Sequence, residues 1–151
     1  MPECNVRLDD MMPLIRESLE QGNSVRFSPR GTSMLPMLRQ GLDTVILSPL
    51  PPRRLNKYEL PMYQRKNGQY VVHRIVKAGE TYTCMGDNQF QKEPGLSQDQ
   101  MIALVTGFTR NGKEHSVDEL SHRAYCRLWN YSRPIRLVWR YFLWYVRRVF
   151  R

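Results

Sequence analysis

Three polar residues in the middle of the chain are of the types that nucleophilic catalysis requires. Ser33 lies in the stretch GTSMLPML (31–38), His73 in YVVHRIV (70–76) and Asp87 in CMGDNQF (84–90). A serine hydroxyl is an effective nucleophile only when a neighbouring base accepts its proton. A carboxylate that orients this base completes such a site. These residue types therefore predict a serine hydrolase, provided that the fold brings the three side chains together.

His73 is the best candidate for the base among the three histidines. It alternates with Val71 and Ile75, so the three residues share one face of an expected strand. An imidazole among aliphatic side chains is partly desolvated, which keeps it neutral and able to accept a proton near pH 7. His115 and His122 lie in polar sequence surroundings, and we expect both to be exposed. The structural alternative for His73 is a half-buried ring that bonds to a backbone carbonyl.

Ser33 and Asp87 also have purely structural interpretations. The stretch around Ser33 can be an ordinary loop, because glycine and proline mark turns. Gly86-Asp87-Asn88 follows an expected strand, so Asp87 lies at a strand end where it could orient an imidazole. An Asp-Asn pair can instead form a turn in which the side chains bond to their own backbone. The residue types alone leave both alternatives open.

The elements that must position these residues are mainly strands. Asn67-Gly68 between two β-rich runs indicates a hairpin within residues 58–76. Asn111-Gly112 marks a second tight turn before the short run KEHSV (113–117). We therefore expect a mainly β domain of the α+β class. The other expected strands are SVRFSP (24–29), DTVILSPL (43–50), TYTCMG (81–86) and MIALVTGFTR (101–110).

Helices are expected at both ends of the chain. Residues 9–21 carry apolar side chains four apart on one face, with Asp9 or Asp10 as the N-cap, and Gly22 is well placed to end this helix. The pattern becomes helical again from residue 117 to 131, and Pro134 begins a last helix. The apolar positions of the first helix are Met11, Ile15 and Leu19.

The positive charge is concentrated at the end of the chain. The formal net charge is +9 at pH 7, and residues 121–151 contain eight arginines and no acidic residue. Residues 1–120 hold the other 15 basic residues and all 14 acidic ones. We therefore divide the chain into a β domain with a leading helix (1–120) and an arginine-rich helical extension (121–151). This asymmetry favours an anionic partner, either membrane lipid or nucleic acid.

Residues 134–151 have the pattern of an amphipathic helix. Five arginines gather within about a third of the helical wheel, and Val138, Trp139 and Phe142 lie opposite them. Such a helix suits the headgroup region of an anionic membrane. It could equally dock its apolar face on the β domain and leave its arginines in water. Nucleic-acid binding is a third interpretation, although no recognised DNA-binding motif accompanies the basic stretch.

The cysteines and the N-terminal residues indicate the cellular compartment in which we expect the protein. Cys4, Cys84 and Cys126 are odd in number and lack CxxC spacing, which argues against a disulfide framework or a zinc site and is typical of a reducing compartment. Charged residues interrupt the N-terminus, and no segment has the roughly 18–20 apolar residues of a membrane span. We expect a cytoplasmic protein without metal or cofactor, with peripheral membrane contact as an option.

Taken together and in this order, the motifs resemble the catalytic domain of the signal peptidase I superfamily, which includes the LexA-type self-cleaving repressors. The resemblance covers about residues 25–108 and rests on GTSMLPML, GLDTVIL, GQYVVHRIV and MGDNQ. It is closer to the endoplasmic-reticulum-type branch, in which the histidine of His-Arg-Ile replaces the general-base lysine of other members. The resemblance implies a coiled β-sheet fold with an N-terminal helix, and a serine endopeptidase.

The resemblance also implies a role for each motif residue. Ser33 becomes the nucleophile, with its backbone N–H as the oxyanion donor, His73 the general base, and Asp87 the acid that supports the histidine. Met34 and Pro36 would shape the nucleophile loop and contact the substrate. Val71 and Ile75 would line a strand face on which an extended substrate peptide lies. A peptide or a small precursor protein is the expected substrate.

The chain departs from the family pattern at three points. The Gly-Asp of the family appears as Gly41-Leu42-Asp43, which makes Asp43 a structural residue. The second family acid has no clear equivalent, with Glu93 and Asp99 both possible. The membrane anchor that usually precedes the serine is missing. Two other functions therefore remain open: a non-catalytic peptide- or leader-binding module on the same scaffold, and a nucleic-acid-associated regulator.

Overall fold

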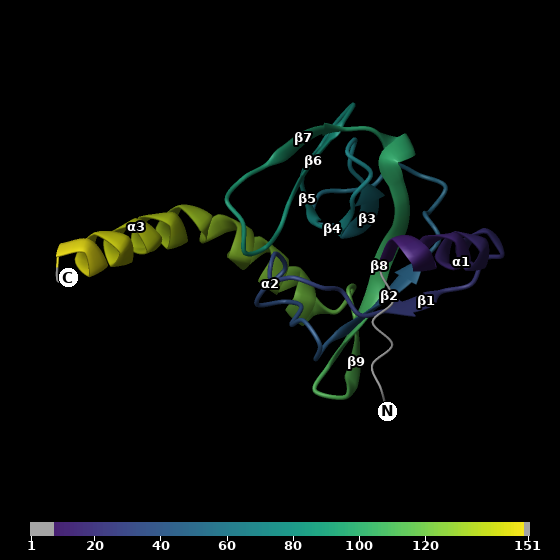
Figure 1. Cartoon of the computed structure of the whole chain (residues 1–151), viewed down its shortest axis with the longest axis horizontal. Coiled ribbons are helices and arrows are strands. Elements are labelled where there is room, and N and C mark those ends of the chain that lie inside the picture. Colours follow the sequence, from purple (N-terminus) through teal and green to yellow (C-terminus); the bar gives the residue numbers. More distant parts are fainter. Residues whose placement is uncertain (1–7, 150–151) are drawn as a thin grey trace.

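Antiparallel strands form a curled, half-barrel sheet with helices at its periphery (Figure 1). The computed structural model describes residues 8–149, and within them the chain has α+β architecture with three α-helices. The expected α+β class is therefore confirmed. In chain order the elements are α1 (Leu8–Glu20), β1 (Val25–Phe27), β2 (Thr44–Ser48), β3 (Pro61–Gln64), β4 (Tyr70–Val72), β5 (Arg74–Ala78), β6 (Tyr82–Met85), β7 (Glu93–Leu96), the 3₁₀ turn Gln98–Gln100, β8 (Met101–Arg110), β9 (Lys113–Ser116), α2 (Leu120–Tyr131) and α3 (Arg133–Val149).

The strands belong to two sheets. The larger sheet has the order β1-β2-β8-β3-β4, and β9 pairs with the end of β8. Strand β8 is ten residues long and pairs with β2, β3 and β9, so it is the central strand of the larger sheet. The smaller sheet has the order β5-β6-β7. Two of the elements that meet at the site, β4 and β7, therefore come from different sheets.

The hairpin predicted around Asn67-Gly68 is present, but the strand expected to follow it is divided. β3 and β4 pair with Tyr63 opposite Val71, and Gly68 turns the chain with a φ of 86°. β4 ends at Val72, and β5 begins at Arg74 in the other sheet. The expectation that His73 lies within one continuous strand is therefore wrong. His73 lies at the crossing between the two sheets.

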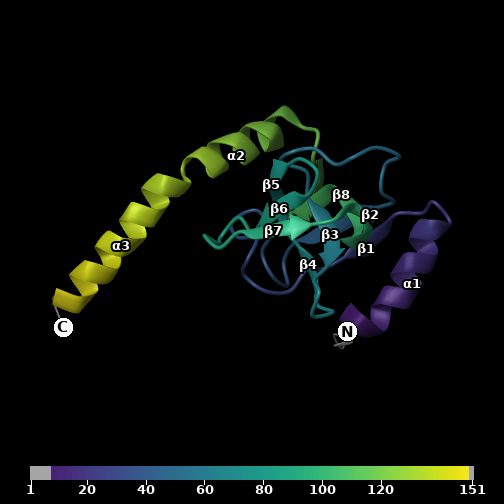
Figure 2. The same cartoon turned by 90° about the horizontal axis from the view of Figure 1, so that it is seen from above.

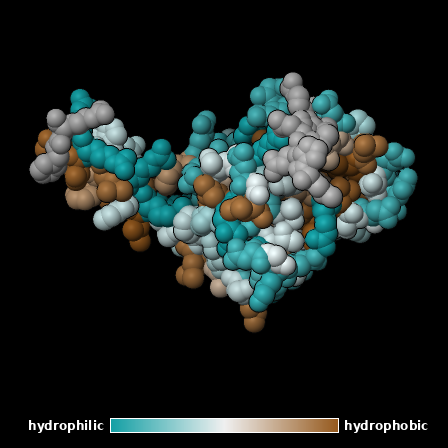
Figure 3. Space-filling model, turned by 60° about the horizontal axis from the view of Figure 1, so that its bottom comes forward, coloured by the Kyte–Doolittle hydropathy of each residue, from teal (hydrophilic) through white to brown (hydrophobic). Residues whose placement is uncertain are grey.

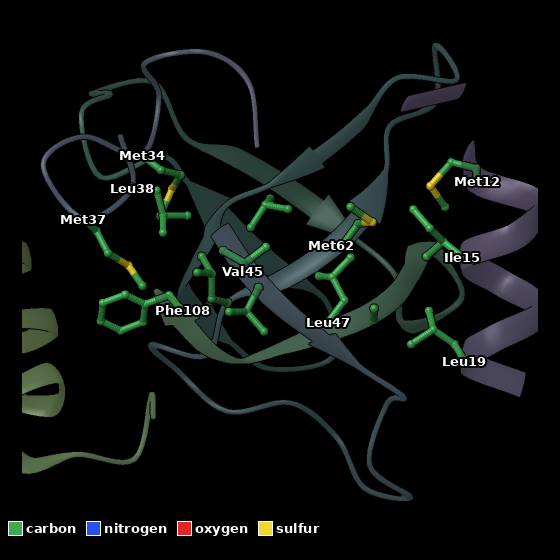
Figure 4. Close-up of a cluster of buried hydrophobic side chains, with 14 residues drawn as sticks. Met12, Ile15, Leu19, Met34, Met37, Leu38, Val45, Leu47, Met62 and Phe108 are labelled. Atoms are coloured by element: carbon green, nitrogen blue, oxygen red, sulfur yellow. The ribbon is translucent and has the colours of Figure 1, made fainter. Parts of the chain in front are cut away.

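The hydrophobic core links the leading helix to the loop that carries Ser33. Met12, Ile15 and Leu19 of α1 pack against one end of the larger sheet, whereas Met34 and its neighbours Met37 and Leu38 pack near Phe108 at the other (Figure 4). The burial of these three apolar side chains fixes the Ser33 loop to the larger sheet. The Ser33 loop is therefore not a free surface loop.

The leading helix follows the sequence prediction closely. It spans Leu8–Glu20, with Ile15 and Leu19 buried and Met11 partly buried against the core. Gly22 ends it with a φ of 81°, and the N–H of Asn23 bonds to the carbonyl of Ser18. This pair of features is typical of a helix end that a glycine terminates. The helix already includes Leu8, so Asp9 and Asp10 lie within it and the expectation that one of them is the N-cap is wrong.

The two C-terminal helices differ in how they meet the body. Helix α2 packs on it and buries His122 and Cys126, so the expectation that His122 is exposed is wrong. The ring of His122 lies near the rings of Phe108 and Tyr125, so its environment is aromatic. Helix α3 continues beyond α2 as an arm that extends away from the sheets (Figures 1 and 2). Among residues 8–149, no helix has the length and apolar character needed to cross a membrane.

Candidate active site

Ser33 and His73, 40 residues apart in sequence, are in direct contact. Oγ of Ser33 lies 3.1 Å from Nε2 of His73, within hydrogen-bonding distance. The 86–89 loop holds the backbone of Ser33 in place, because the N–H of Asn88 donates to the carbonyl oxygen of Ser33 at 2.8 Å. Ser33 is half-buried, whereas His73 exposes only 2% of its surface. A hydroxyl and an imidazole thus meet at the edge of the core.

The other ring nitrogen of His73 meets a carboxylate from β7. Nδ1 of His73 lies 2.9 Å from Oε1 of Glu93. A carboxylate can only accept at this position, so Nδ1 carries the proton and Nε2 is free to accept one from Ser33. The hydroxyl of Tyr63 lies 3.3 Å from the same Nδ1. The arrangement Ser33–His73–Glu93 has the connectivity of a serine hydrolase triad.

Glu93 is itself fixed by an arginine on the neighbouring hairpin. Nε of Arg65 donates to Oε2 of Glu93 at 2.7 Å, and its terminal nitrogen donates to Oε1. Burial alone would raise the pKa of Glu93, but the hydrogen bonds from Arg65 and the adjacent His73 lower it below its ordinary value. Glu93 is therefore ionised at neutral pH and remains a hydrogen-bond acceptor for the imidazole.

The environment of His73 suits a general base. Burial lowers the pKa of His73 below 6.5, and the charge of Glu93 opposes this shift only in part. The ring is therefore neutral near pH 7 and can accept a proton. When it does so, the Glu93 carboxylate beside Nδ1 stabilises the imidazolium that forms.

Asp87 does not support the histidine, which corrects the role inferred for it. Its two carboxylate oxygens accept hydrogen bonds from Nε and a terminal nitrogen of Arg74, both at 2.8 Å. Both side chains are 1% exposed. His73 contacts Ser33 and Glu93, whereas Arg74 contacts Asp87, so these adjacent side chains lie in different surroundings. A buried guanidinium requires a carboxylate partner, and Asp87 is that partner.

Asp87 joins the site to helix α2 rather than taking part in it. The hydroxyl of Tyr125 donates to Oδ2 of Asp87 at 3.1 Å, and the indole N–H of Trp129 donates to the Asp87 carbonyl at 2.8 Å. The Asp-Asn turn interpretation also falls short, because the carboxylate bonds to side chains far along the chain. Asp87 is a structural residue that anchors the loop behind Ser33.

Gly86 allows this loop to approach the nucleophile. A Cβ atom at Gly86 would lie 2.6 Å from the carbonyl oxygen of Ser33, closer than Cβ atoms approach other atoms. The side-chain amide of Asn88 also donates to the carbonyl of Thr32 at 3.1 Å. Within residues 8–149, the N–H of Ser33 has no hydrogen-bond partner. That N–H is therefore available to a bound group.

The four residues expected to contact substrate lie in different environments. Met34 exposes 5% of its surface and Ile75 none, so both are core residues and that expectation is wrong for them. Pro36 is exposed and Val71 is half-buried. Val71 lies on β4, whose described pairing is with β3 alone, so β4 is an edge of the larger sheet beside His73.

The structure also shows what the other acidic residues of the family pattern contact. Asp99 is exposed on the 3₁₀ turn, so of the two candidates for the second acid only Glu93 reaches His73. Asp43 is structural, because it is fully buried and bonds to the N–H and guanidinium of Arg39. Tyr63 and Arg65 complete the site and were not predicted from the sequence. Their alternation on β3 and its turn gave no sign of this role.

Other features of the described chain do not belong to this site. Two hollows of about 590 and 340 Å³ lie beside α2 and α3, and neither is lined by Ser33, His73 or Glu93. Residues 8–149 contain no cluster of three or more histidine, cysteine or acidic side chains suited to a metal ion. Cys84 and Cys126 are free and buried, whereas Cys4 lies outside the described residues. Neither a protein-family model nor a curated protein matches the chain.

Proposed function

We propose that the protein is a serine endopeptidase in which Ser33 is the nucleophile and His73 the general base. The observation that carries this proposal is the continuous contact from Oγ of Ser33 through both ring nitrogens of His73 to Glu93. Serine, histidine and carboxylate in this order supply what a hydroxyl needs to attack a carbonyl carbon. A structural role for the histidine would not need a hydroxyl on one nitrogen and an ionised carboxylate on the other.

The chemical steps follow from the contacts. His73 accepts the proton of Ser33 at Nε2 while Oγ attacks the scissile carbonyl carbon. The oxyanion that forms can be stabilised by the free N–H of Ser33. His73 then returns the proton to the leaving amine, and the C–N bond breaks to leave an acyl-serine. Water, deprotonated by the same histidine, hydrolyses the acyl group and restores Ser33.

A peptide is the proposed substrate because an edge strand lies beside the nucleophile. β4 borders the larger sheet directly before His73, and an extended chain can add to such an edge by main-chain hydrogen bonds. The half-buried Val71 lies on this edge strand. The curled antiparallel sheet and the order of the motifs support, as a further proposal, kinship with signal peptidase and LexA-type domains.

Cleavage of peptides by matched variants tests this function. We expect the full-length protein to cleave members of a peptide mixture, and Ser33→Ala and His73→Ala to lose this cleavage by about 10²-fold or more. Thr32→Ala, which removes the adjacent exposed hydroxyl, should retain it. If peptides are bound but left intact by the wild type, the protein is a peptide-binding module, and the proposed catalysis is wrong.

A further inference from the structure

The polar side of helix α3 faces the body of the protein. Arg133 and Arg136 donate hydrogen bonds to backbone carbonyl oxygens of the 86–89 loop. One turn further on, the Arg140 guanidinium lies 5.6 Å from the centre of the Phe90 ring. This is the reverse of a helix that docks its apolar side on the domain, so that interpretation of the sequence is wrong.

The opposite side of α3 is a continuous apolar surface in solvent. At about 100° per residue, its members fall within one sector of the helix, opposite the arginines. Apart from the partly buried Val146, each exposes between 53% and 74% of its surface. Figure 3 shows hydrophobic side chains gathered along one side of this arm and hydrophilic ones beside them. This apolar face consists of Ile135, Val138, Trp139, Phe142, Val146 and Val149.

The charge of the arm identifies what covers this face. Residues 121–151 hold eight arginines and no acidic residue, so the arm complements an anionic surface. Beyond the root of α3, Arg147 and Arg148 continue the polar side, and the Arg148 guanidinium lies 5.2 Å from the Trp144 ring centre. A second copy paired through this face would offer the arginines no counter-charge, because residues 121–151 hold no acidic residue. A lipid surface offers hydrocarbon to the apolar face and phosphate to the arginines at once.

We propose that α3 is an interfacial helix that binds anionic phospholipid membranes in the plane of the headgroups. Its apolar face enters the acyl boundary, and the exposed arginines Arg140, Arg147 and Arg148 lie at the level of the phosphates. The body contacts α3 through Arg133 and Arg136, on the side opposite the apolar face, so it would lie on the aqueous side of the membrane. Figure 2 shows that most of α3 extends away from the sheets. The inference does not depend on the proposed peptidase activity, because it uses no residue of the Ser33 site.

Binding of the full-length protein to vesicles tests this inference. We expect sedimentation with phosphatidylcholine vesicles that contain phosphatidylglycerol, weaker binding in high salt, and little binding to phosphatidylcholine alone. The double variant Val138→Asp/Phe142→Asp should bind at least about tenfold more weakly. Two of the chain's three tryptophans, Trp139 and Trp144, lie on α3, so vesicles should shift part of the emission of the wild type to the blue.

A matched double variant controls for the added charge. Leu14→Asp/Leu42→Asp alters two apolar side chains of the body that are 67% and 70% exposed, and it should bind vesicles like the wild type. Circular dichroism would establish that both double variants fold. The inference is wrong if the arm variant binds as well as the control. It is also wrong if the wild type ignores anionic vesicles and instead binds duplex DNA or dimerises through this face.

Discussion

Nδ1 of His73 lies 2.9 Å from a carboxylate oxygen of Glu93, whereas Asp87 in the Gly-Asp-Asn motif is bound to Arg74. Two carboxylates near Ser33 thus have separate partners. Glu93 faces His73 and holds the ring proton at Nδ1. Asp87 neutralises a buried guanidinium and fixes the loop that touches Ser33. Two consequences of this division can be measured.

Glu93→Gln should impair turnover and shift its pH dependence. The carboxylate of Glu93 raises the pKa of His73, which burial lowers, so removing the charge lowers that pKa further. We expect kcat/KM to fall by about 10²- to 10⁴-fold, and its acidic limb to move to lower pH. Asp99→Asn, at the exposed alternative acid, should change neither. An acidic limb that stays in place in Glu93→Gln would contradict the assignment.

Asp87→Asn should act on stability. The change leaves the guanidinium of Arg74 buried without its counter-charge, because both side chains are 1% exposed. We expect the free energy of unfolding in urea to fall by about 3–5 kcal/mol. The matched control Glu114→Gln breaks the exposed Arg26–Glu114 pair and should cost less than about 1 kcal/mol. Equal losses in the two variants would mean that the Asp87 pair is not structural.

His122 should make the fold sensitive to acid. Burial and the charge of Arg74 lower the pKa of His122 to about 4, against 6.5 in an unfolded chain. Between these values the unfolded state binds the additional proton, so stability falls as the pH drops from 6.5 toward 4. At pH 5 the expected loss is about 2 kcal/mol relative to pH 7.5.

His122→Gln should remove the loss of stability that His122 causes between pH 7.5 and pH 5. Urea unfolding at the two pH values measures this loss as a difference in the free energy of unfolding. The part that belongs to His73, whose pKa is also lowered, should persist. Direct titration of the His122 ring by NMR gives an independent check. A ring that titrates near 6.5 would contradict the buried environment described for it.

Short sequence motifs predicted much of the fold because the conformation of a turn or a helix end depends mainly on the residues within it. Asn67-Gly68 predicts the hairpin through the left-handed conformation that glycine tolerates, and Gly22 predicts a helix end in the same way. Strand β7, with the sequence EPGL, has no strand pattern, and it forms because β6 offers it a partner. The strand that carries Glu93 was therefore not foreseen.

The pairing of acids with bases depends on tertiary placement. His73 and Arg74 are adjacent, and both need a carboxylate, but the sequence does not say which acid each receives. The change of sheet between Val72 and Arg74 decides it, because it directs the two side chains into different surroundings. The periodicity of α3 likewise predicted its two faces but not which one meets the body. Arg133 and Arg136 decide that through carbonyls of a distant loop.

Labelling by a serine-reactive fluorophosphonate tests the central claim most directly. The site of modification would be located by mass spectrometry in the wild type and in His73→Ala. We expect modification at Ser33 alone in the wild type, with a rate that increases as His73 loses its proton, and a loss of about 10²-fold or more in His73→Ala. Modification of Ser33 at the same rate in both proteins, or of other serines equally, would contradict an activated nucleophile.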